Sequence, residues 1–473
     1  MNQHRPATRH TYRRNAPRQA PCPQGGMPGR RKQRLTRTVR GIAYGCVLLV
    51  HVTTAEYRAR CGCWKTFRTQ VEGVEPKAHY TNQVRAAVLD RLLDDHRSLE
   101  RILAALRRDF GLELSTGFVY DCLRWQVGRC DHAAYRAWAL QEFSGTLCLD
   151  EIHLGRFTLL LATDPLHDFP VAFALVSAND GDHRARFLGQ LRDHGLHPRV
   201  VITDGSPLYP SLLARLWPRA RHQLCAFHVL RDLLDYLLAA VRQRIRAFRR
   251  RASRPRRPRR RGRPTRQAAR ARQGRRSLAA QAAFVWKHRF LIVARRARLS
   301  AARRAALGKV LAYQPSLGEL RRFADDLYRL FDPAQTAAQA WHRWEEVTAN
   351  PTYRDDPSLR PLWGLLAAAT FGKVLAFLGS PAGARQRTNN HAERTNRALR
   401  REERSRYRWR SARGMVRFVL LQIHRQWQRR LAEAAQEARP RPGPGGGGGT
   451  FPPPPPPRAG GAAGPPPRCP QAA

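Results

Sequence analysis

Hydrophobic residues recur at helical spacing over residues 80–127, where they predict three short amphipathic helices. Polar residues that favour the start of a helix open each of them, namely Thr81, Ser98 and either Ser115 or Thr116. Three short helices with a polar start to the third fit a helix-turn-helix, and a plain three-helix bundle has the same pattern. The spacing alone leaves both interpretations open.

The pattern changes to apolar runs with short turns over residues 145–226. The runs GTLCLDEIHL, RFTLLLATDPL and FPVAFALVSAND are short and rich in β-branched residues, which favours three antiparallel strands. A helix that ends before Gly195, a buried strand that ends at Asp204, another helix and a short strand follow. This order predicts a mixed α/β sheet, and it matches the order of the ribonuclease H-like fold.

The rest of the folded chain is predicted to be helical, with candidate helices near 228–247, 278–312, 316–331, 335–349 and 358–378 and two more within 388–436. Three stretches rich in arginine, proline or glycine show no core pattern and predict disorder or exposed loop. The predicted organisation is a disordered basic arm (1–40), a cysteine-containing segment (41–79), a helix-turn-helix domain (80–140), the first part of the α/β core (141–230), a helical insertion (231–380) with a basic loop (249–276), the final core helices (381–436) and a disordered Pro/Gly-rich tail (437–473).

Arginine dominates the charge of the chain. The 86 lysines and arginines against 35 acids leave a formal charge of +51, which favours a polyanion such as nucleic acid as the partner. Only six of the 86 are lysines, so GC-rich coding explains part of the same excess. The charge indicates a polyanionic partner without indicating which one.

The nine cysteines, an odd number scattered along the chain, predict a reducing compartment and no disulfide framework. The longest apolar run, 41–52, is much shorter than the roughly 20 residues that cross a bilayer. The basic segment before it is too long for an ordinary signal peptide. We expect a soluble, cytoplasmic protein that has no membrane partner.

Two carboxylates are placed for metal chemistry. Phosphodiester chemistry with two divalent ions needs hard oxygen ligands from separate elements. Asp150 lies inside an apolar strand, where an acid is costly unless it is paired or bound to metal. Asp204 ends another buried strand, although a turn or helix cap also explains it. Glu151 is expected on the opposite face of the strand from Asp150, and simple turn formers are expected at Asp164, Asp180 and Asp182.

Four motifs together resemble the DDE transposases of bacterial insertion sequences. They are LCLDEIH, VVITDGSPLYP, HQLCAFH and TNNHAERTNR, and the resemblance covers roughly residues 60–436. It implies a ribonuclease H-like catalytic core interrupted by a helical insertion, with Asp150, Asp204 and Glu393 as the first, second and third acid. Taken alone, the residues around Glu393 also fit an ordinary surface helix with Glu-to-Arg pairs.

The resemblance also implies an activity. Such an enzyme binds the ends of its mobile element in double-stranded DNA, cuts a strand with Mg²⁺ or Mn²⁺ held by the three acids, and joins the freed 3′-hydroxyl to target DNA. It acts in the bacterial cytoplasm, at the nucleoid, as a homo-oligomer of at least two chains. Ser115, Thr116 and Tyr120 of the third predicted helix are then expected to approach DNA, while a packed aromatic is the alternative for Tyr120.

Two other functions stay open at this stage. One is a catalytically silent, transposase-derived DNA-binding protein. The other is a ribonuclease H-like nuclease that cuts without joining.

The cysteine motifs resemble zinc elements of the same transposases only in part. YRARCGCWKTF resembles the second knuckle of an N-terminal zinc ribbon, but Cys61 and Cys63 have C-x-C spacing, and only the lone Cys22 and Cys46 lie upstream. A structural zinc site needs about four ligands. We therefore interpret the segment as a degraded ribbon and do not expect a complete Zn²⁺ site.

Cys225 and His228 match the C-x2-H element of Mutator-like and related transposases. Two ligands do not make a tetrahedral zinc site. We expect this pair to pack near the active site instead.

Overall fold

The computed structural model describes residues 7–63, 65–154, 156–252, 266–381, 385–405 and 411–437. The chain divides into two units, Met1–Trp427 and Gln428–Ala473. The predicted Pro/Gly-rich tail lies outside the described residues, apart from Glu437. The elements below belong to the first unit, except for the end of the last helix.

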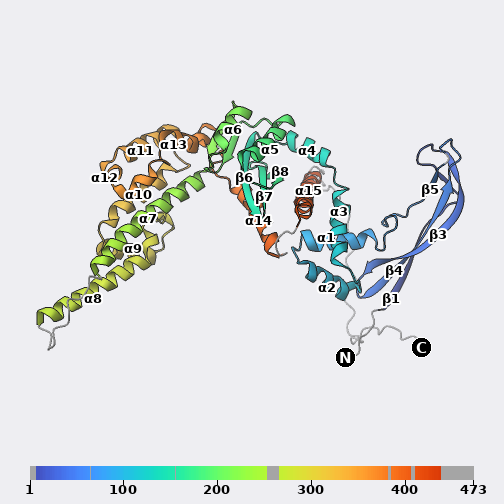
Figure 1. Cartoon of the computed structure of the whole chain (residues 1–473), viewed down its shortest axis with the longest axis horizontal. Coiled ribbons are helices and arrows are strands. Elements are labelled where there is room, and N and C mark those ends of the chain that lie inside the picture. The colour runs from blue at the N-terminus through green and yellow to red at the C-terminus, as the bar shows by residue number, and fades with distance from the viewer. Residues whose placement is uncertain are drawn as a thin grey trace, which may run out of the picture. The chain divides into compact units, whose positions relative to one another are not determined.

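The N-terminal residues form a five-stranded sheet (Figure 1). Strand β4 lies between β1, in parallel, and β3, in antiparallel orientation. Gly45 has a φ of 71° in the tight turn from β3 to β4, a conformation that glycine adopts without steric cost. The strands are β1 (Thr8–Asn15), β2 (Gln19–Pro21), β3 (Pro28–Ala43), β4 (Cys46–Arg58) and β5 (Thr66–Arg68).

The prediction of a disordered arm over 1–40 is therefore wrong for residues 8–40. Along β3 most arginine side chains are exposed, while Val39 is buried with Val50 and Val52 of β4. The buried partners of this strand lie beyond residue 40. Because they follow the arginine-rich stretch in the chain, composition within that stretch did not reveal them.

The three predicted short helices are present and begin where their polar residues predicted. They are α1 (Asn82–Leu93), α2 (Leu99–Phe110) and α3 (Thr116–Val127), followed by α4 (His132–Gln141). Ser115 is the residue that caps α3, since its side chain accepts a hydrogen bond from the backbone N–H of Phe118. Tyr120 is 49% exposed, so it is not the packed aromatic that was the alternative.

The central sheet has the predicted order of elements, with strand order β10-β9-β6-β7-β8. β6, β7 and β8 pair antiparallel, while β9 and β10 add in parallel on the other side of β6. The bounds are β6 (Thr146–Leu154), β7 (Phe157–Asp164), β8 (Phe169–Val176), α5 (Gly181–Asp193), β9 (Val200–Thr203), α6 (Tyr209–Leu216) and β10 (Arg221–Leu224).

The helical insertion has its own core, in which α7, α8, α10 and α13 contribute buried aliphatic and aromatic side chains. Its elements are α7 (Ala226–Ala252), α8 (Arg266–Lys287), the short 3₁₀ turns η1 (Arg289–Leu291) and η2 (Arg296–Arg298), α9 (Ala301–Tyr313), α10 (Leu317–Leu330), α11 (Ala337–Ala349), α12 (Pro351–Arg354), η3 (Pro357–Leu362), α13 (Ala368–Leu375) and η4 (Ala376–Gly379).

The basic loop predicted over 249–276 is helical wherever it is described. α7 continues to Ala252 and α8 begins at Arg266, while 253–265 lie outside the described residues. Arginine is a good helix former, and a long exposed arm tolerates it on every face. The run of arginines was therefore compatible with helix, and its charge alone did not indicate a loop.

Two final helices complete the fold, α14 (Asn390–Ser405) and α15 (Ala412–Glu437). α14 lies beside β6 and β7 (Figure 1). The apolar run at 41–52 belongs to the β3–β4 hairpin. Among the described residues, no helix combines the length and apolarity that a membrane crossing requires.

Candidate active site

Asp150 and Asp204 lie at the same end of two neighbouring parallel strands. Cys148 of β6 pairs with Ile202 of β9, the last of three paired positions. Asp150 lies two residues after Cys148, and Asp204 lies two residues after Ile202. The shared register therefore brings both carboxylates to one edge of the sheet. The strand pairing therefore explains why acids far apart in sequence meet here.

Asp150 has an environment that disfavours its charge. Burial and the nearby acids Glu151, Asp204 and Glu393 together raise its pKa to about 7, against one opposing backbone hydrogen bond. Repulsion from Asp204 and Glu393 means that all three predicted acids lie within electrostatic reach of one another. A cation at this place would offset both the burial and the repulsion.

Glu151 belongs to a different cluster, as the strand alternation predicted. Its carboxylate accepts hydrogen bonds from Arg184 of α5 at 2.5 Å and from the Tyr209 hydroxyl of α6 at 3.1 Å. Arg184 is only 2% exposed, so the pair is an internal ion pair. It occupies the face of the sheet opposite Asp150. The sequence showed no signal for this partner, because Arg184 looked like one of many surface arginines.

Glu393 reaches the site from the first turn of α14. The side chain of Asn389, fully buried just before this helix, donates to the backbone oxygen of Leu149 at 3.0 Å. Its backbone N–H donates to the sulfur of Cys225 at 3.3 Å. Asn389 thus ties the start of α14 to the strand residue next to Asp150, and this contact sets where Glu393 lies.

Asn396 of α14 contacts Asp150 directly. The side-chain N–H of Asn396 donates to Oδ2 of Asp150 at 2.7 Å. Oδ1 of Asn396 and Oε1 of Glu393 are buried and accept no hydrogen bond from any described residue. Buried oxygens without a donor are costly, and hard oxygen atoms are what Mg²⁺ and Mn²⁺ prefer. The residues present therefore fit a divalent cation.

The carboxylates are spaced more widely than the ligands of a single ion. Within the described ranges, only the cysteines 22, 61 and 63 form a group of three whose ligand atoms all lie within 4.8 Å of one another. A site for two ions, which lie about 3.5 to 4 Å apart, needs a wider set of ligands than a site for one.

The C-x2-H element lies beside these acids. Nε2 of His228 is 3.4 Å from Oε1 of Glu393, and Cys225 is fully buried against Asn389. Among the described residues, the basic side chain within 4 Å of the Glu393 carboxylate is that of His228 in α7, whereas the surface-helix alternative predicts an arginine one turn away. Cys225 and His228 thus lie beside the candidate acids, and neither belongs to a metal cluster among the described residues.

The three acids expected at turns act as turn and cap residues. The fully buried Asp164 accepts hydrogen bonds from the backbone N–H groups of Ser144, Leu166 and His167. Asp180 caps α5 through the N–H of His183, and Asp182 lies in the first turn of that helix.

Three cysteines of the N-terminal sheet meet in a separate cluster. The sulfur atoms of Cys61 and Cys63 are 2.9 Å apart, and that of Cys22 lies 3.5 and 3.6 Å from them. Backbone N–H groups of Gly25 and Gln24 lower the pKa of Cys22 to about 7, which favours the thiolate that binds zinc. The view that Cys22 stands alone is thus wrong, because the strand pairing brings it to the C-x-C motif. Cys46 lies outside the cluster.

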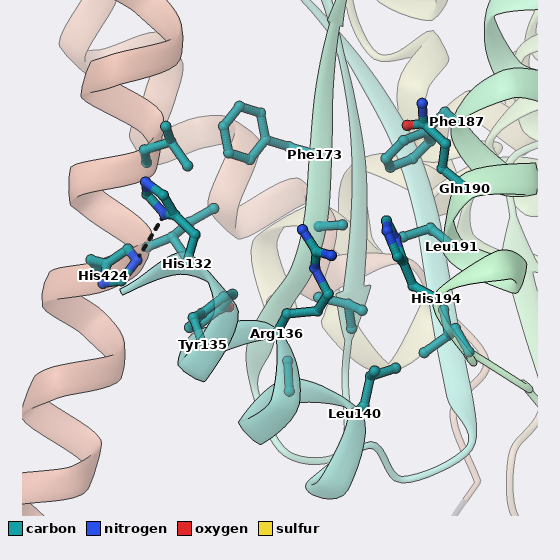
Figure 2. Close-up of a pocket in the computed structure, with 16 residues that line it drawn as sticks. His132, Tyr135, Arg136, Leu140, Phe173, Phe187, Gln190, Leu191, His194 and His424 are labelled. Atoms are coloured by element: carbon teal, nitrogen blue, oxygen red, sulfur yellow. Dashed lines mark hydrogen bonds between the residues drawn. The ribbon is translucent and has the colours of Figure 1, made fainter. Parts of the chain in front are cut away.

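A cavity of about 410 Å³ lies between α4, α5, the edge strand β8 and α15. Figure 2 shows His132 and His424 pointing toward each other on one side of it, with their ring nitrogens 3.2 Å apart. Its lining is largely apolar and contains no carboxylate. It therefore lacks the ligands for the metal chemistry that the three acids suggest.

Comparison with known proteins identifies the family. The sequence model of a transposase family, the ISL3 type of the DDE class, matches residues 147–407, more than half of the chain, and this range includes all three acids. The match defines the class of protein as the DDE transposases. Within this class, the chain belongs to the ISL3 family of transposases.

The Drosophila P element transposase strand transfer complex is a similar solved structure, with a TM-score of 0.37 and 11% sequence identity over 75% of this chain and 94% of that chain. None of the curated proteins matches the chain.

Proposed function

We propose that this transposase binds the ends of its mobile element, cuts them by metal-dependent hydrolysis and joins the freed 3′-hydroxyl to target DNA. The observation that carries the proposal is the convergence of Asp150, Asp204 and Glu393 around one sheet edge. The strand order β10-β9-β6-β7-β8, followed by a helical insertion and a returning helix, supports a ribonuclease H-like core.

Each acid has its own part in holding the ions. Asp150, which both other acids influence, would contribute to holding both ions, and Asp204 and Glu393 would each help to hold one. When bound, two Mg²⁺ or Mn²⁺ ions activate the attacking oxygen and stabilise the leaving one. Asn396 orients Asp150 through its hydrogen bond of 2.7 Å, and Asn389 holds α14 in place against β6.

DNA contacts come from the helical domain at α1–α3 and from exposed arginines. Ser115 and Thr116 at the start of α3 and the exposed Tyr120 are placed to meet DNA if α3 is the recognition helix of a helix-turn-helix. The charge of +51 favours phosphate contacts that weaken with salt. Because both ends of an element are processed together, the active form contains at least two chains.

A zinc ion held by Cys22, Cys61 and Cys63 would tie the turn after β2 to the segment after β4. Structural zinc binds four ligands, so a fourth donor would have to join the three thiolates. Bound there, the ion would stabilise the N-terminal sheet.

The test uses the full-length protein and the DNA that flanks its own gene on both sides. Wild type is expected to bind this DNA in EDTA, and with Mg²⁺ or Mn²⁺ to release cut ends and joined products. Asp150→Asn, Asp204→Asn and Glu393→Gln are expected to bind like wild type and to lower cutting by at least about 10²-fold. Asp193→Asn, which changes an exposed acid of α5, is the matched control and should cut normally.

The products separate the alternatives. Cut ends without joining indicate a nuclease, and binding without any product indicates a catalytically silent protein. Cutting by Asp150→Asn contradicts the assignment of the acids.

A further inference from the structure

A basic groove lined by aromatic side chains lies next to the acids, on the side of the helical insertion. We call it the insertion groove. Its volume is about 550 Å³, within the range of roughly 300–1,000 Å³ that is typical of ligand pockets. The residues of its lining on which the argument depends are Phe227, Arg231, Arg295, Arg298, Tyr328 and Arg387.

The groove adjoins the candidate active site through two short connections. Phe227 precedes His228, whose Nε2 lies 3.4 Å from Oε1 of Glu393. Thr388 and Asn390 flank Asn389, the residue that holds α14 against β6. Residues that line the groove are thus chain neighbours of residues that contact Glu393 or position it. A DNA strand that passes the acids therefore also meets the groove.

One aromatic ring that lines the groove is exposed. Phe227 is 49% exposed, although burial of an aromatic ring normally stabilises a protein. Its ring packs edge-on against His228. Tyr328 also lines the groove, and its hydroxyl donates to the backbone oxygen of Val293. An exposed ring beside a cavity is suited to stack against a flat ligand.

The charge of the groove is strongly positive. Four arginines and one aspartate line it. Arg387 donates to the backbone oxygen of Phe331, and Arg231 pairs with Asp232. Within the described part of the chain, Arg295 and Arg298 form no ion pair, and Arg295 lies 6.0 Å from the centre of the Tyr328 ring. Arg295 and Arg298, which have no acidic partner among the described residues, line the same groove as the exposed ring of Phe227. This combination matches a ligand that carries both a phosphate and a flat base.

We propose that the insertion groove binds an unpaired nucleotide of single-stranded DNA, with the base stacked on Phe227 and the backbone phosphate held by Arg295 and Arg298. A base within a duplex is covered on both faces, whereas an unpaired base offers a face to an aromatic ring. The groove holds one strand beside the acids that cut it. This inference rests on the proposed function, because it assigns the same site a binding position for a strand end.

The first experiment measures binding of a fluorescein-labelled 20-nucleotide thymidine strand to the full-length protein by anisotropy, in EDTA so that no strand is cut. Phe227→Ala is expected to weaken binding about tenfold, since stacking contributes about 1–3 kcal/mol per base. Phe227→Trp keeps the ring and should bind within about twofold of wild type. Phe290→Ala is the matched control, because Phe290 is equally exposed, at 49%, in the same insertion but outside the groove.

The arginines have a separate readout. Replacing Arg295 and Arg298 together by alanine should lower the slope of log affinity against log salt by about 1.4, at roughly 0.7 for each lost phosphate contact on a single strand. Phe227→Ala should leave that slope unchanged. Equal affinity of wild type and Phe227→Ala for the strand overturns the proposal, and so does an equal loss in Phe290→Ala.

A cross-linking experiment locates the base. A strand that carries 5-iododeoxyuridine, irradiated in the complex, should attach to peptides that contain Phe227 or Tyr328, as mapped by mass spectrometry. Attachment only outside the groove contradicts the proposal, as does a strand affinity no higher than that of polyphosphate of the same charge. Asp150→Asn should give the same result as wild type in both experiments, so a failure of catalysis is distinguishable from a failure of this inference.

Discussion

At the scale of single residues, Asp150 and Glu151 are neighbours whose environments differ completely. Glu151 is neutralised by the buried Arg184 and the Tyr209 hydroxyl. Asp150 has only the amide of Asn396 as a side-chain donor among the described residues, and acids surround it. The protein thus keeps one acid permanently paired and leaves the other in need of a cation.

The raised pKa of Asp150 predicts how stability depends on pH. Because the folded state holds this proton up to about pH 7, while the ordinary pKa is 3.8, folding binds more protons between these values. The contribution of Asp150 to the free energy of unfolding should therefore fall as pH rises from about 4 to about 7 and then stay level. Asp150→Asn removes this loss. In EDTA, the free energy of unfolding of Asp150→Asn relative to that of wild type should therefore rise by about 2–3 kcal/mol between pH 5 and pH 8.

Urea unfolding at the two pH values measures this difference. Mg²⁺ at pH 8 should restore the stability of wild type and leave Asp150→Asn unchanged. A constant difference between the two proteins across the range would contradict the environment described for Asp150.

At the scale of elements, the position of α14 depends on asparagines that cannot be distinguished from their polar neighbours by sequence alone. Asn389 is fully buried and Asn390 is exposed. Asn389, Glu393 and Asn396 follow helical spacing, which the sequence showed. That Asn389 faces a backbone oxygen of β6 depends on the packing of α14 against the sheet.

These two neighbours form a matched pair for mutation. Asn389→Ala should lower the free energy of unfolding by about 1–3 kcal/mol, because the buried oxygen of Leu149 loses its side-chain donor. It should also lower cutting of flanking DNA while leaving binding intact, since Glu393 is displaced. Asn390→Ala should change stability by no more than about 0.5 kcal/mol. Denaturant unfolding and the cutting assay check both, and equal effects of the two changes would argue against this docking role.

The N-terminal sheet supplies a prediction about zinc. The purified protein should contain about one zinc ion per chain, released by chelators and lost in Cys22→Ser and Cys61→Ser. Cys46→Ser, which lies outside the cluster, should retain the metal. Elemental analysis gives the metal content, and zinc that persists in Cys22→Ser would show that another site holds it.

At the scale of the whole molecule, the charge of +51 governs association with DNA. Affinity for duplex DNA should fall by about 10³- to 10⁵-fold between 50 and 200 mM salt, as expected for roughly six to ten phosphate contacts. Anisotropy titrations at several salt concentrations measure the slope. A fall of less than about tenfold would mean that most of the arginines make no contact with phosphate.

Local pattern was sufficient for most elements of the fold. The short apolar runs and β-branched content of residues 145–226 predicted the strands and helices in their order, and Thr81, Ser98 and Ser115, the last named with Thr116 as the alternative, marked the helix starts. These features reflect hydrogen bonding and burial within a few residues, which the sequence carries directly. The N-terminal sheet was missed because its buried partners lie on a neighbouring strand.

The sequence by itself determined the positions of the core elements, the three candidate acids and the family resemblance that the comparison confirmed. Only the tertiary structure decided that Cys22 meets Cys61 and Cys63, that Arg184 neutralises Glu151, and that Asn389 secures α14 beside Asp150. Each of these contacts joins residues far apart in the chain. Their formation depends on strand register and helix packing, which bring distant side chains together and which no local pattern encodes.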